Sequence, residues 1–191
     1  MALHPAEHRG YRELVLSARR LEAHWTALHP RLPEMSGRAG VAGGAAEAGR
    51  LLAELEPILA AHGLHARPAA RAAGSARGIA RGAVGDRFLE VAQALRLAAL
   101  PLRHVLALLV SLGAVARGRD EPDLAAFCER WGATLRARDA TLDTAIAALG
   151  ASPDAMVAPL DPSPAGRAAH AVGLALGALG EWVDDRAATR R

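Results

Sequence analysis

The sequence predicts an all-α protein, an antiparallel four-helix bundle with an additional C-terminal helix. Helix-favouring alanine, leucine, arginine and glutamate are abundant, whereas there are only three isoleucines, two phenylalanines and one tyrosine. Apolar residues recur at three- and four-residue steps over long stretches, which is typical of amphipathic helices. A chain of 191 residues that is 51% hydrophobic is long enough to bury one continuous core. We therefore expect one helical domain over 1–191, with the core bundle at about 10–150 and the last helix at about 164–188.

The first helix is expected from about Pro5 or Gly10 to His29, followed at once by Pro30. The next stretch, Pro33–Gly44, contains four glycines and is expected to be a loop. The apolar stripe of the first helix comprises Tyr11, Leu14, Ala18, Leu21, Trp25 and Leu28, and continues to Leu32.

The second helix is expected over about Ala45–His62, with a kink at Pro57 because proline removes a backbone hydrogen bond. The small-residue stretch Pro68–Gly85 is interpreted as a connector. The third helix is then expected to begin at Asp86, a good N-cap residue, and to continue to about Arg117.

The fourth helix is expected to open at Asp120-Glu121-Pro122, an N-cap followed by an early proline, and to end at Gly150. After a proline-rich turn, Ser163-Pro164 begins the last helix, which is expected to reach about Ala188.

One apolar window raises the question of a membrane. Leu97–Ala116 is about long enough to span a bilayer, but Arg103 and His104 lie near its middle, so a buried central helix is expected instead. The first ten residues lack the basic flank and apolar run of a signal peptide. Cys128 is the only cysteine, which suits a reducing compartment. We therefore expect a cytoplasmic protein without a membrane segment.

The basic residues are all arginine, 23 in number, and the net charge is +3. A sequence pI of about 10.3 would ordinarily indicate nucleic-acid binding, but here it mostly reflects the high pKa of arginine. We interpret the absence of lysine as codon bias in a GC-rich genome, and nucleic acid is an unlikely partner.

A stretch of the chain resembles a known family. Leu55–Leu64 reads Leu-Glu-Pro-Ile-Leu-Ala-Ala-His-Gly-Leu and is followed by a small-residue connector and a long helix carrying Arg103-His104. An Arg-Asp-Glu break then precedes a helix with Leu135–Asp139. From Gly44 to Gly150 this order resembles the YciF-type branch of the ferritin-like superfamily.

The resemblance implies a ferritin-like bundle, whose di-iron site needs inward-facing carboxylates and Glu-x-x-His pairs. Here Arg103 stands beside His104 where the family would have glutamate. Arg136 and Arg138 flank the position expected to be acidic in the fourth helix. Because arginines repel a metal ion, the resemblance implies that the iron centre has been lost, and no cofactor or metal is expected.

Charged residues on the expected core helices predict an internal polar layer. His104 lies in the most apolar helix and is interpreted as a core histidine with hydrogen-bond partners, or alternatively as a ligand to a metal or small molecule. Buried charges must be paired. The predicted members of the layer are Arg103, His104, Arg138, Asp139, Glu47, Glu54 and Glu22.

Other candidate sites have simpler structural interpretations. His4 and His8 are one helical turn apart, but only Glu7 stands near them and they lie at the chain terminus. Cys128 is on an apolar stripe, which favours a structural thiol over a nucleophile. Gly40–Gly44 follows no predicted strand, so it does not indicate a phosphate loop.

The last helix has an unusual pattern. Gly173, Gly177 and Gly180 recur at three- and four-residue steps opposite large apolar residues. A face of glycines lets another helix approach closely, so these residues are a predicted helix–helix interface, either with the bundle or across a two-fold axis. Compositional drift toward glycine is the alternative.

No catalytic constellation stands out in the sequence. The first functional hypothesis is a non-catalytic helical-bundle protein that acts through protein–protein contacts, either as a homodimer or with another protein. The alternative hypothesis is a bundle that binds a metal or small ligand at an internal site near His104.

Overall fold

The computed structural model describes residues 3–64 and 89–188, which are almost entirely helical. Within these residues there is no β-strand, and one isolated bridge joins Glu90 to Pro159. The all-α class predicted from the sequence is therefore confirmed for this part of the chain. The helices are α1 (Pro5–Leu28), the 3-10 helix η1 (His29–Arg31), α2 (Ser36–Ala61), α4 (Val91–Gly118), α5 (Pro122–Gly150), α6 (Pro153–Met156) and α7 (Pro164–Ala188).

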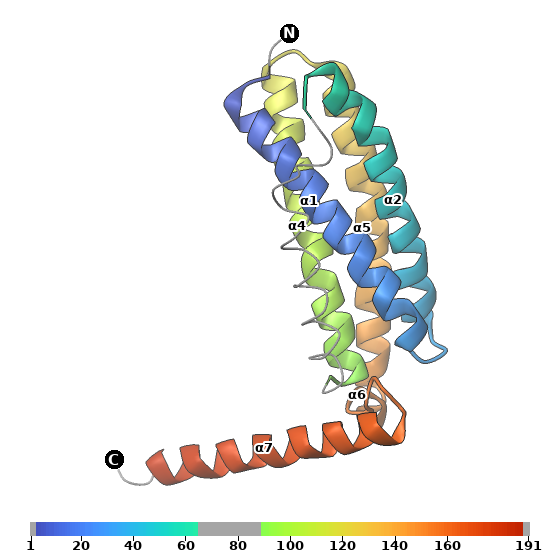
Figure 1. Ribbon diagram of the computed structural model, residues 1–191, viewed down its shortest axis with the longest axis vertical. Coiled ribbons are helices and arrows are strands. Elements are labelled where there is room, and N and C mark those ends of the chain that lie inside the picture. The colour runs from blue at the N-terminus through green and yellow to red at the C-terminus, as the bar shows by residue number, and fades with distance from the viewer. Residues whose placement is uncertain (1–2, 65–88, 189–191) are drawn as a thin grey trace.

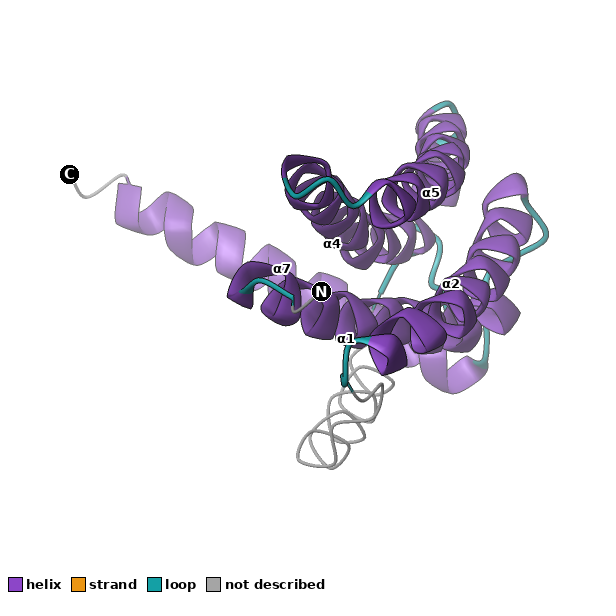
Figure 2. Ribbon diagram, turned by 90° about the horizontal axis from the view of Figure 1, so that it is seen from above, coloured by secondary structure: helices purple, strands orange, loops and turns teal. Residues whose placement is uncertain are grey.

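Four long helices lie side by side, and we call α1, α2, α4 and α5 together the helical body (Figure 1). Helix α1 packs against α2 and α4, and α5 packs against the same two helices from the other side. The view along the helices shows this arrangement, with α7 extending away from the body (Figure 2).

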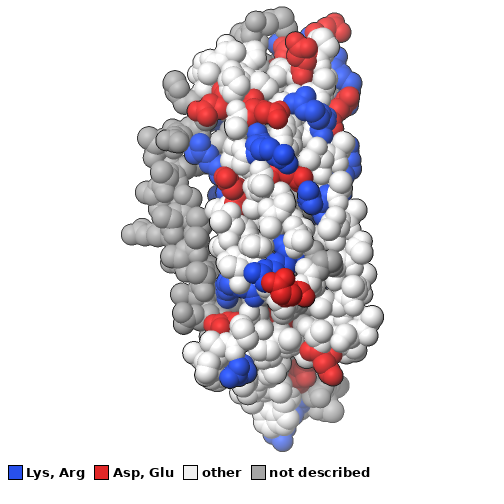
Figure 3. Space-filling view, turned by 90° about the vertical axis from the view of Figure 1, so that its right-hand side faces the viewer, with Lys and Arg blue, Asp and Glu red and all other residues white. Residues whose placement is uncertain are grey.

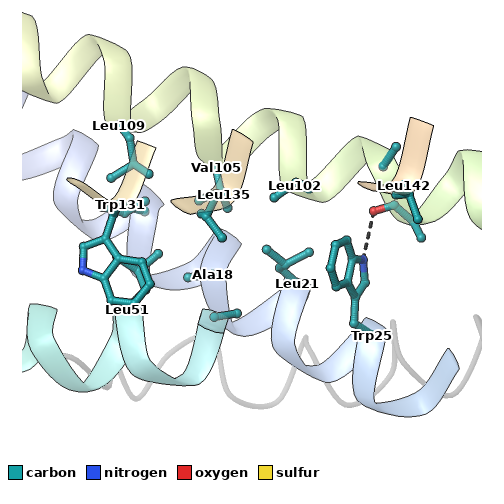
Figure 4. Close-up of a cluster of buried hydrophobic side chains, with 14 of the residues drawn as sticks. Ala18, Leu21, Trp25, Leu51, Leu102, Val105, Leu109, Trp131, Leu135 and Leu142 are labelled. Carbon is teal, nitrogen blue, oxygen red and sulfur yellow. Dashed lines mark hydrogen bonds between the residues drawn. The ribbon is translucent and has the colours of Figure 1, made fainter. Parts of the chain in front are cut away.

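The core forms where the apolar stripes of these helices meet (Figure 4). Leu21, Leu51 and Leu102 come from three different helices and are fully buried. Complete burial of such a side chain stabilises the fold by about 1.5–3 kcal/mol. The Trp25 indole also donates a hydrogen bond of 2.9 Å to the Ala98 carbonyl oxygen, which ties α1 to α4.

Helix α2 begins nine residues earlier than the sequence suggested, at Ser36, so the predicted loop over Pro33–Gly44 is wrong for most of its length. The glycines there form a helical face that lies close to neighbouring helices. A β-carbon added at Gly37 would be 3.1 Å from that of Ala145, and one added at Gly44 would overlap the Trp25 ring. Glycine is unfavourable in a helix by about 1 kcal/mol, but close packing of this segment offsets that cost.

The other boundaries agree with the sequence more closely. Helix α5 begins at Pro122 and ends at Gly150, and α7 covers Pro164–Ala188. Helix α1 begins at Pro5 in a capping box, where His4 accepts from the first turn and the Glu7 side chain accepts from the His4 backbone. The predicted connector Pro68–Gly85 and the predicted N-cap Asp86 lie outside the described residues.

Helix α4 is long and apolar enough to cross a membrane by length and composition alone. A core helix of a soluble protein passes the same test. One side of α4 contributes to the core, including Leu95, Leu102 and Leu109, whereas Leu100 and Val110 are exposed. The prediction of a central helix buried on most sides is therefore wrong, because within 3–64 and 89–188 the other helices cover only part of the circumference of α4.

The base of α7 is attached to the body. Leu160 is fully buried, and its amide donates to the Leu89 carbonyl oxygen at 2.9 Å. The Ser163 hydroxyl accepts from the Gly166 amide at 3.0 Å, and Gly166 packs directly on Asp161. His170 is the last buried residue described in α7, and the helix projects away from the body (Figures 1 and 2). We call residues 171–188 the arm.

Candidate functional site

The predicted internal polar layer does not form. Its members are distributed over separate contacts between different pairs of helices, most of them at the surface. Viewed from the side of α2 and α5, arginines and acidic residues alternate over the body without gathering into one patch of a single sign (Figure 3). The reason is geometric, since the charged residues other than the buried Glu47 lie at the edges of helix–helix contacts rather than on their inner faces.

The pair of Arg138 and Glu47 is the most buried of these contacts. Nε and Nη2 of Arg138 donate to the two carboxylate oxygens of Glu47, each at 2.7 Å. The Glu47 side chain is only 7% exposed and that of Arg138 is 33% exposed. These hydrogen bonds raise the pKa of Arg138. Arg138 and Glu47, both predicted members of the polar layer, therefore pair with each other.

Gly43 makes room for this pair. A β-carbon at residue 43 would lie 3.0 Å from Cζ of Arg138, so the guanidinium group lies directly on the glycine backbone. The fork of the guanidinium matches the two carboxylate oxygens, which is the strongest geometry for such a pair. This contact joins α2 to α5. Because the guanidinium and the carboxylate neutralise each other, neither group is available to act on a substrate.

Arg103 lies on the outer edge of α4 and α5. Its Nε donates to Asp139 at 3.0 Å and its Nη2 to Asp143 at 2.5 Å. The hydrogen bond and charge of Asp139 raise the pKa of Arg103. Arg103 and Asp139, predicted to share an internal layer with Arg138, therefore contact each other at the surface instead, together with Asp143.

His104 is not a core histidine. Its side chain is about half exposed, and Nε2 lies 3.0 Å from Oε1 of Glu13 in α1. The prediction failed because residue 104 belongs to the uncovered side of α4. An internal ligand site centred on His104 is therefore incompatible with its position.

Glu54 and Glu22 have separate surroundings. Glu54 accepts from Arg130 at 2.6 Å and from the Trp131 indole at 3.0 Å, and these bonds lower its pKa. Glu22 lines an open groove of about 540 Å³ between α1 and α2, with Arg19 on the same helix. Neither carboxylate reaches the pair of Arg138 and Glu47.

The di-iron site implied by the family resemblance does not fit these residues. Among the described residues, no group of three or more histidine, cysteine, aspartate or glutamate side chains could hold a metal ion. At the middle of the body the core is filled by leucines, and the buried carboxylate of Glu47 is already bound by Arg138. Arg138 therefore occupies the carboxylate of Glu47, which would have to be a ligand if a metal were bound in the interior.

Sequence reasoning missed one buried charged cluster, at the start of α1. Glu7 is fully buried, and its Oε2 accepts from the His4 amide and lies 3.1 Å from Nε of Arg119. Tyr11, one turn further along, is also buried, and burial raises the pKa of its hydroxyl. The signal was present, because Glu7 continues the apolar stripe through Tyr11 and Leu14 by one more turn.

Cys128 is buried on the stripe of α5 as expected. Burial raises the pKa of its thiol to about 11. It lines a cleft of about 170 Å³ between α4 and α5 whose lining includes Val110, Arg117 and Arg136. A thiol that is protonated at neutral pH is a poor nucleophile, so the cleft holds no reactive cysteine.

The arm presents the largest uncovered apolar surface of α7. Val172, Leu176 and Leu179 are 55%, 63% and 56% exposed and lie on one side of the helix. We call these three residues the arm ridge. Leu174, 54% exposed, lies on the opposite side.

Among the residues that the structure describes, the predicted glycine interface has no partner. A β-carbon at Gly177 or Gly180 would meet no atom within 4 Å, and Gly173 is only half-buried. The version in which these glycines pack against the body is therefore wrong. The connector between Leu160 and Gly166 directs α7 outward, away from the four long helices.

In comparisons with models of protein families, with curated proteins and with solved structures, nothing matches this chain.

Proposed function

We propose that this is a non-catalytic helical-bundle protein that acts through protein–protein contacts, and that its contact element is α7. The observation that carries the proposal is the arm ridge. Its three large apolar side chains are all more than half exposed on a helix that leaves the body. Contiguous exposed apolar surface of this kind is typical of interaction sites.

The arm needs a partner for energetic reasons. Burying each ridge side chain fully would contribute about 1.5–3 kcal/mol. The three glycines of the arm, Gly173, Gly177 and Gly180, cost about 1 kcal/mol each relative to alanine. A helix with these residues gains most of its stability from packing, so it is marginal in water unless one face is covered. A covering partner supplies the missing packing.

A protein partner fits the arm better than a lipid surface. Helices that lie on membranes are rich in lysine and arginine on the polar side. Residues 171–188 carry three acidic residues, Glu181, Asp184 and Asp185, against the single arginine Arg186, and anionic lipids would repel this negative balance. Arg186 stacks on the Trp182 ring at 4.0 Å and is thereby already engaged.

We further propose that the body is an antiparallel four-helix bundle of the ferritin-like type, without a di-iron centre. The directions of the helices support this proposal. Along Figure 1, α1 and α5 run one way and α2 and α4 the other, so each packed neighbour is opposed. Helices α2 and α4 run the same way, as do two helices that a long crossover joins in ferritin-like folds.

No observation favours the alternative of a bundle that binds a metal or small ligand at an internal site near His104. His104 is at the surface, and its contact with Glu13 is an ordinary inter-helix pair. We propose a cytoplasmic location, because the single cysteine is buried and suits a reducing compartment.

Photo-crosslinking in the cells that express the protein tests whether α7 contacts a partner. A photoreactive amino acid replaces Leu176 in one variant and Leu174 in a matched control. These positions are similarly exposed on opposite sides of the same helix. We expect a protein adduct from position 176 and little from position 174, with mass spectrometry identifying the adduct. Equal adducts, or none, would refute the proposal.

Elemental analysis tests the proposed absence of iron. The purified full-length chain is expected to contain no stoichiometric iron, because Arg138 occupies the buried carboxylate of Glu47. About two irons per chain would overturn this part of the proposal.

A further inference from the structure

We infer that the cleft between α4 and α5 binds a small monocarboxylate, with the apolar tail of the ligand in the cleft and its carboxylate on Arg136. Such a site goes beyond the contact role proposed for α7 and does not depend on it. Three features carry it: the size and lining of the cleft, a spacing of glycine and arginine that recurs on both helices, and the charge that the ion pairs leave over.

The cleft has an apolar floor and room for a small tail. Leu109 and Cys128 are buried at this floor, and Val110 is 59% exposed at its edge. The volume of about 170 Å³ is close to the roughly 150 Å³ of an apolar protein cavity that accepts benzene. A tail of about six carbon atoms therefore fits the cleft.

On each wall of the cleft, a glycine stands four residues before an arginine. The two pairs are Gly113 with Arg117 in α4 and Gly132 with Arg136 in α5. A long side chain in a helix covers the turn before its own, so each arginine lies over its glycine. A β-carbon at Gly132 would be 3.3 Å from Nη1 of Arg136. One at Gly113 would be 3.8 Å from Nη1 of Arg117. Because neither glycine has a side chain, both guanidinium groups lie at the cleft.

Arg136 is the group left to bind an anion. The other two charged residues of the lining, Arg117 and Glu129, pair with each other at 2.6 Å. The remaining arginines of α5, Arg130 and Arg138, are bound by glutamates of α2. Among the described residues, Arg136 has neither an ion pair nor a side-chain hydrogen bond. The lining, with two arginines and one glutamate, therefore carries one positive charge in excess.

These properties favour a monocarboxylate over other ligands. A guanidinium group binds a carboxylate through two parallel hydrogen bonds. A phosphate monoester carries about −1.5 to −2 at neutral pH, which is more than the single excess charge neutralises. A cation would be repelled, and an anion without a tail would leave the apolar floor exposed to water. Burial raises the pKa of the Cys128 thiol to about 11, so the ligand is held without a covalent bond.

Heteronuclear NMR titration of the full-length chain tests the site, with hexanoate as the probe. We expect hexanoate to shift the amide signals of residues 109–117 and 128–136, with a dissociation constant of about 1 mM or below. Two control probes each lack one half of the ligand, since hexanol has the tail without the charge and acetate has the charge without the tail. Each should bind about tenfold more weakly or worse. Either control bound as tightly as hexanoate would refute the combined site, and unshifted signals at about 20 mM hexanoate would overturn it altogether.

Substitutions then locate the binding. Arg136→Gln removes the excess charge and should weaken hexanoate binding about tenfold, while changing hexanol binding less than about twofold. The matched control is Arg20→Gln, which removes an exposed arginine of α1 outside the cleft and should change neither. Gly132→Leu should fill the cleft and weaken both probes about tenfold or more, and it should fold because its β-carbon first meets the flexible end of Arg136. Circular dichroism checks that each variant keeps its helix content. Equal weakening by Arg136→Gln and Arg20→Gln would mean that the general charge of the chain attracts hexanoate, and would overturn the inference.

Discussion

Glycines line one side of both α2 and α7, but the two helices use them in opposite ways. In α2, Gly37 and Gly44 face Ala145 and Trp25 so closely that a β-carbon would collide or crowd. In α7, Gly177 and Gly180 face open space within the same chain. The sequence pattern predicted an interface for the glycines of α7 and a loop for those of α2, but within the described residues the glycines of α2 are the ones that pack closely against other helices.

The difference shows that a row of glycines specifies only the absence of side chains. Whether that absence allows close packing depends on what lies opposite. In α2 the opposite surface belongs to the same core, where the Trp25 indole is fixed by the Ala98 carbonyl. In α7 the opposite surface must come from another molecule or does not exist. The following substitutions separate covered from uncovered positions, in order of decreasing effect.

Gly44→Ala is expected to have the largest effect. The new methyl group would overlap the Trp25 ring, which is buried and held by its hydrogen bond, so overpacking should cost about 3 kcal/mol or more. Urea unfolding of the full chain measures the change. The control is Gly118→Ala, at the end of α4, where a β-carbon meets nothing within 4 Å. Equal stability of both variants would mean that α2 does not begin at Ser36 in solution.

Arg138→Ala should cost about 3 kcal/mol. It would leave the buried Glu47 carboxylate without its partner, although the partial exposure of Arg138 keeps the loss at the lower end for buried pairs. Arg103→Ala, at the exposed pair with Asp139, should cost less than about 1 kcal/mol. The double variant Glu47→Leu with Arg138→Met should recover most of the loss in chemical denaturation. No recovery would indicate that the pair has a role beyond neutralising its own charges.

Gly177→Ala is expected to act in the opposite direction from Gly44→Ala. Alanine is better than glycine in a helix by about 1 kcal/mol, and the position is open within the chain. The stabilised helix should show a higher helix content by circular dichroism and slower amide hydrogen exchange in the arm. A loss of stability here would show that Gly177 is packed against another surface and would move the contact round the helix.

The smallest effect concerns the exposed contact of Glu54. Hydrogen bonds from Arg130 and Trp131 lower the pKa of Glu54 below its ordinary 4.5. A lowered folded pKa gives stability that is present above pH 4.5 and is lost as pH falls through the folded value. Because the side chain is about half exposed, this contribution should be less than about 1 kcal/mol. The difference in melting temperature between the native chain and Glu54→Gln should therefore shrink between pH 6 and pH 3.

The charged candidate residues also divide into those whose surroundings the sequence predicted and those whose surroundings it did not. That an arginine of the predicted layer pairs with a carboxylate followed from the rule that buried charge is neutralised, and Arg138 pairs with Glu47. The surface positions of Arg103 and His104 did not follow from the same rule, because both lie in an apolar sequence. Their exposure depends on which side of α4 the other helices cover, and no local pattern contains that information.

The sequence by itself determined the helical class, the ends of α5 and α7, and the apolar stripe of α1 from Tyr11 to Leu28. These features depend on residue spacing, on caps and on prolines such as Pro122 and Pro164, which act within a few residues. Only the tertiary structure decided that Gly37–Gly44 is helical, that Glu47 is covered and that His104 is not. The physical reason is that the stability of a poor helix and the burial of a charge both depend on surfaces distant in the sequence, which the chain brings together only when it folds.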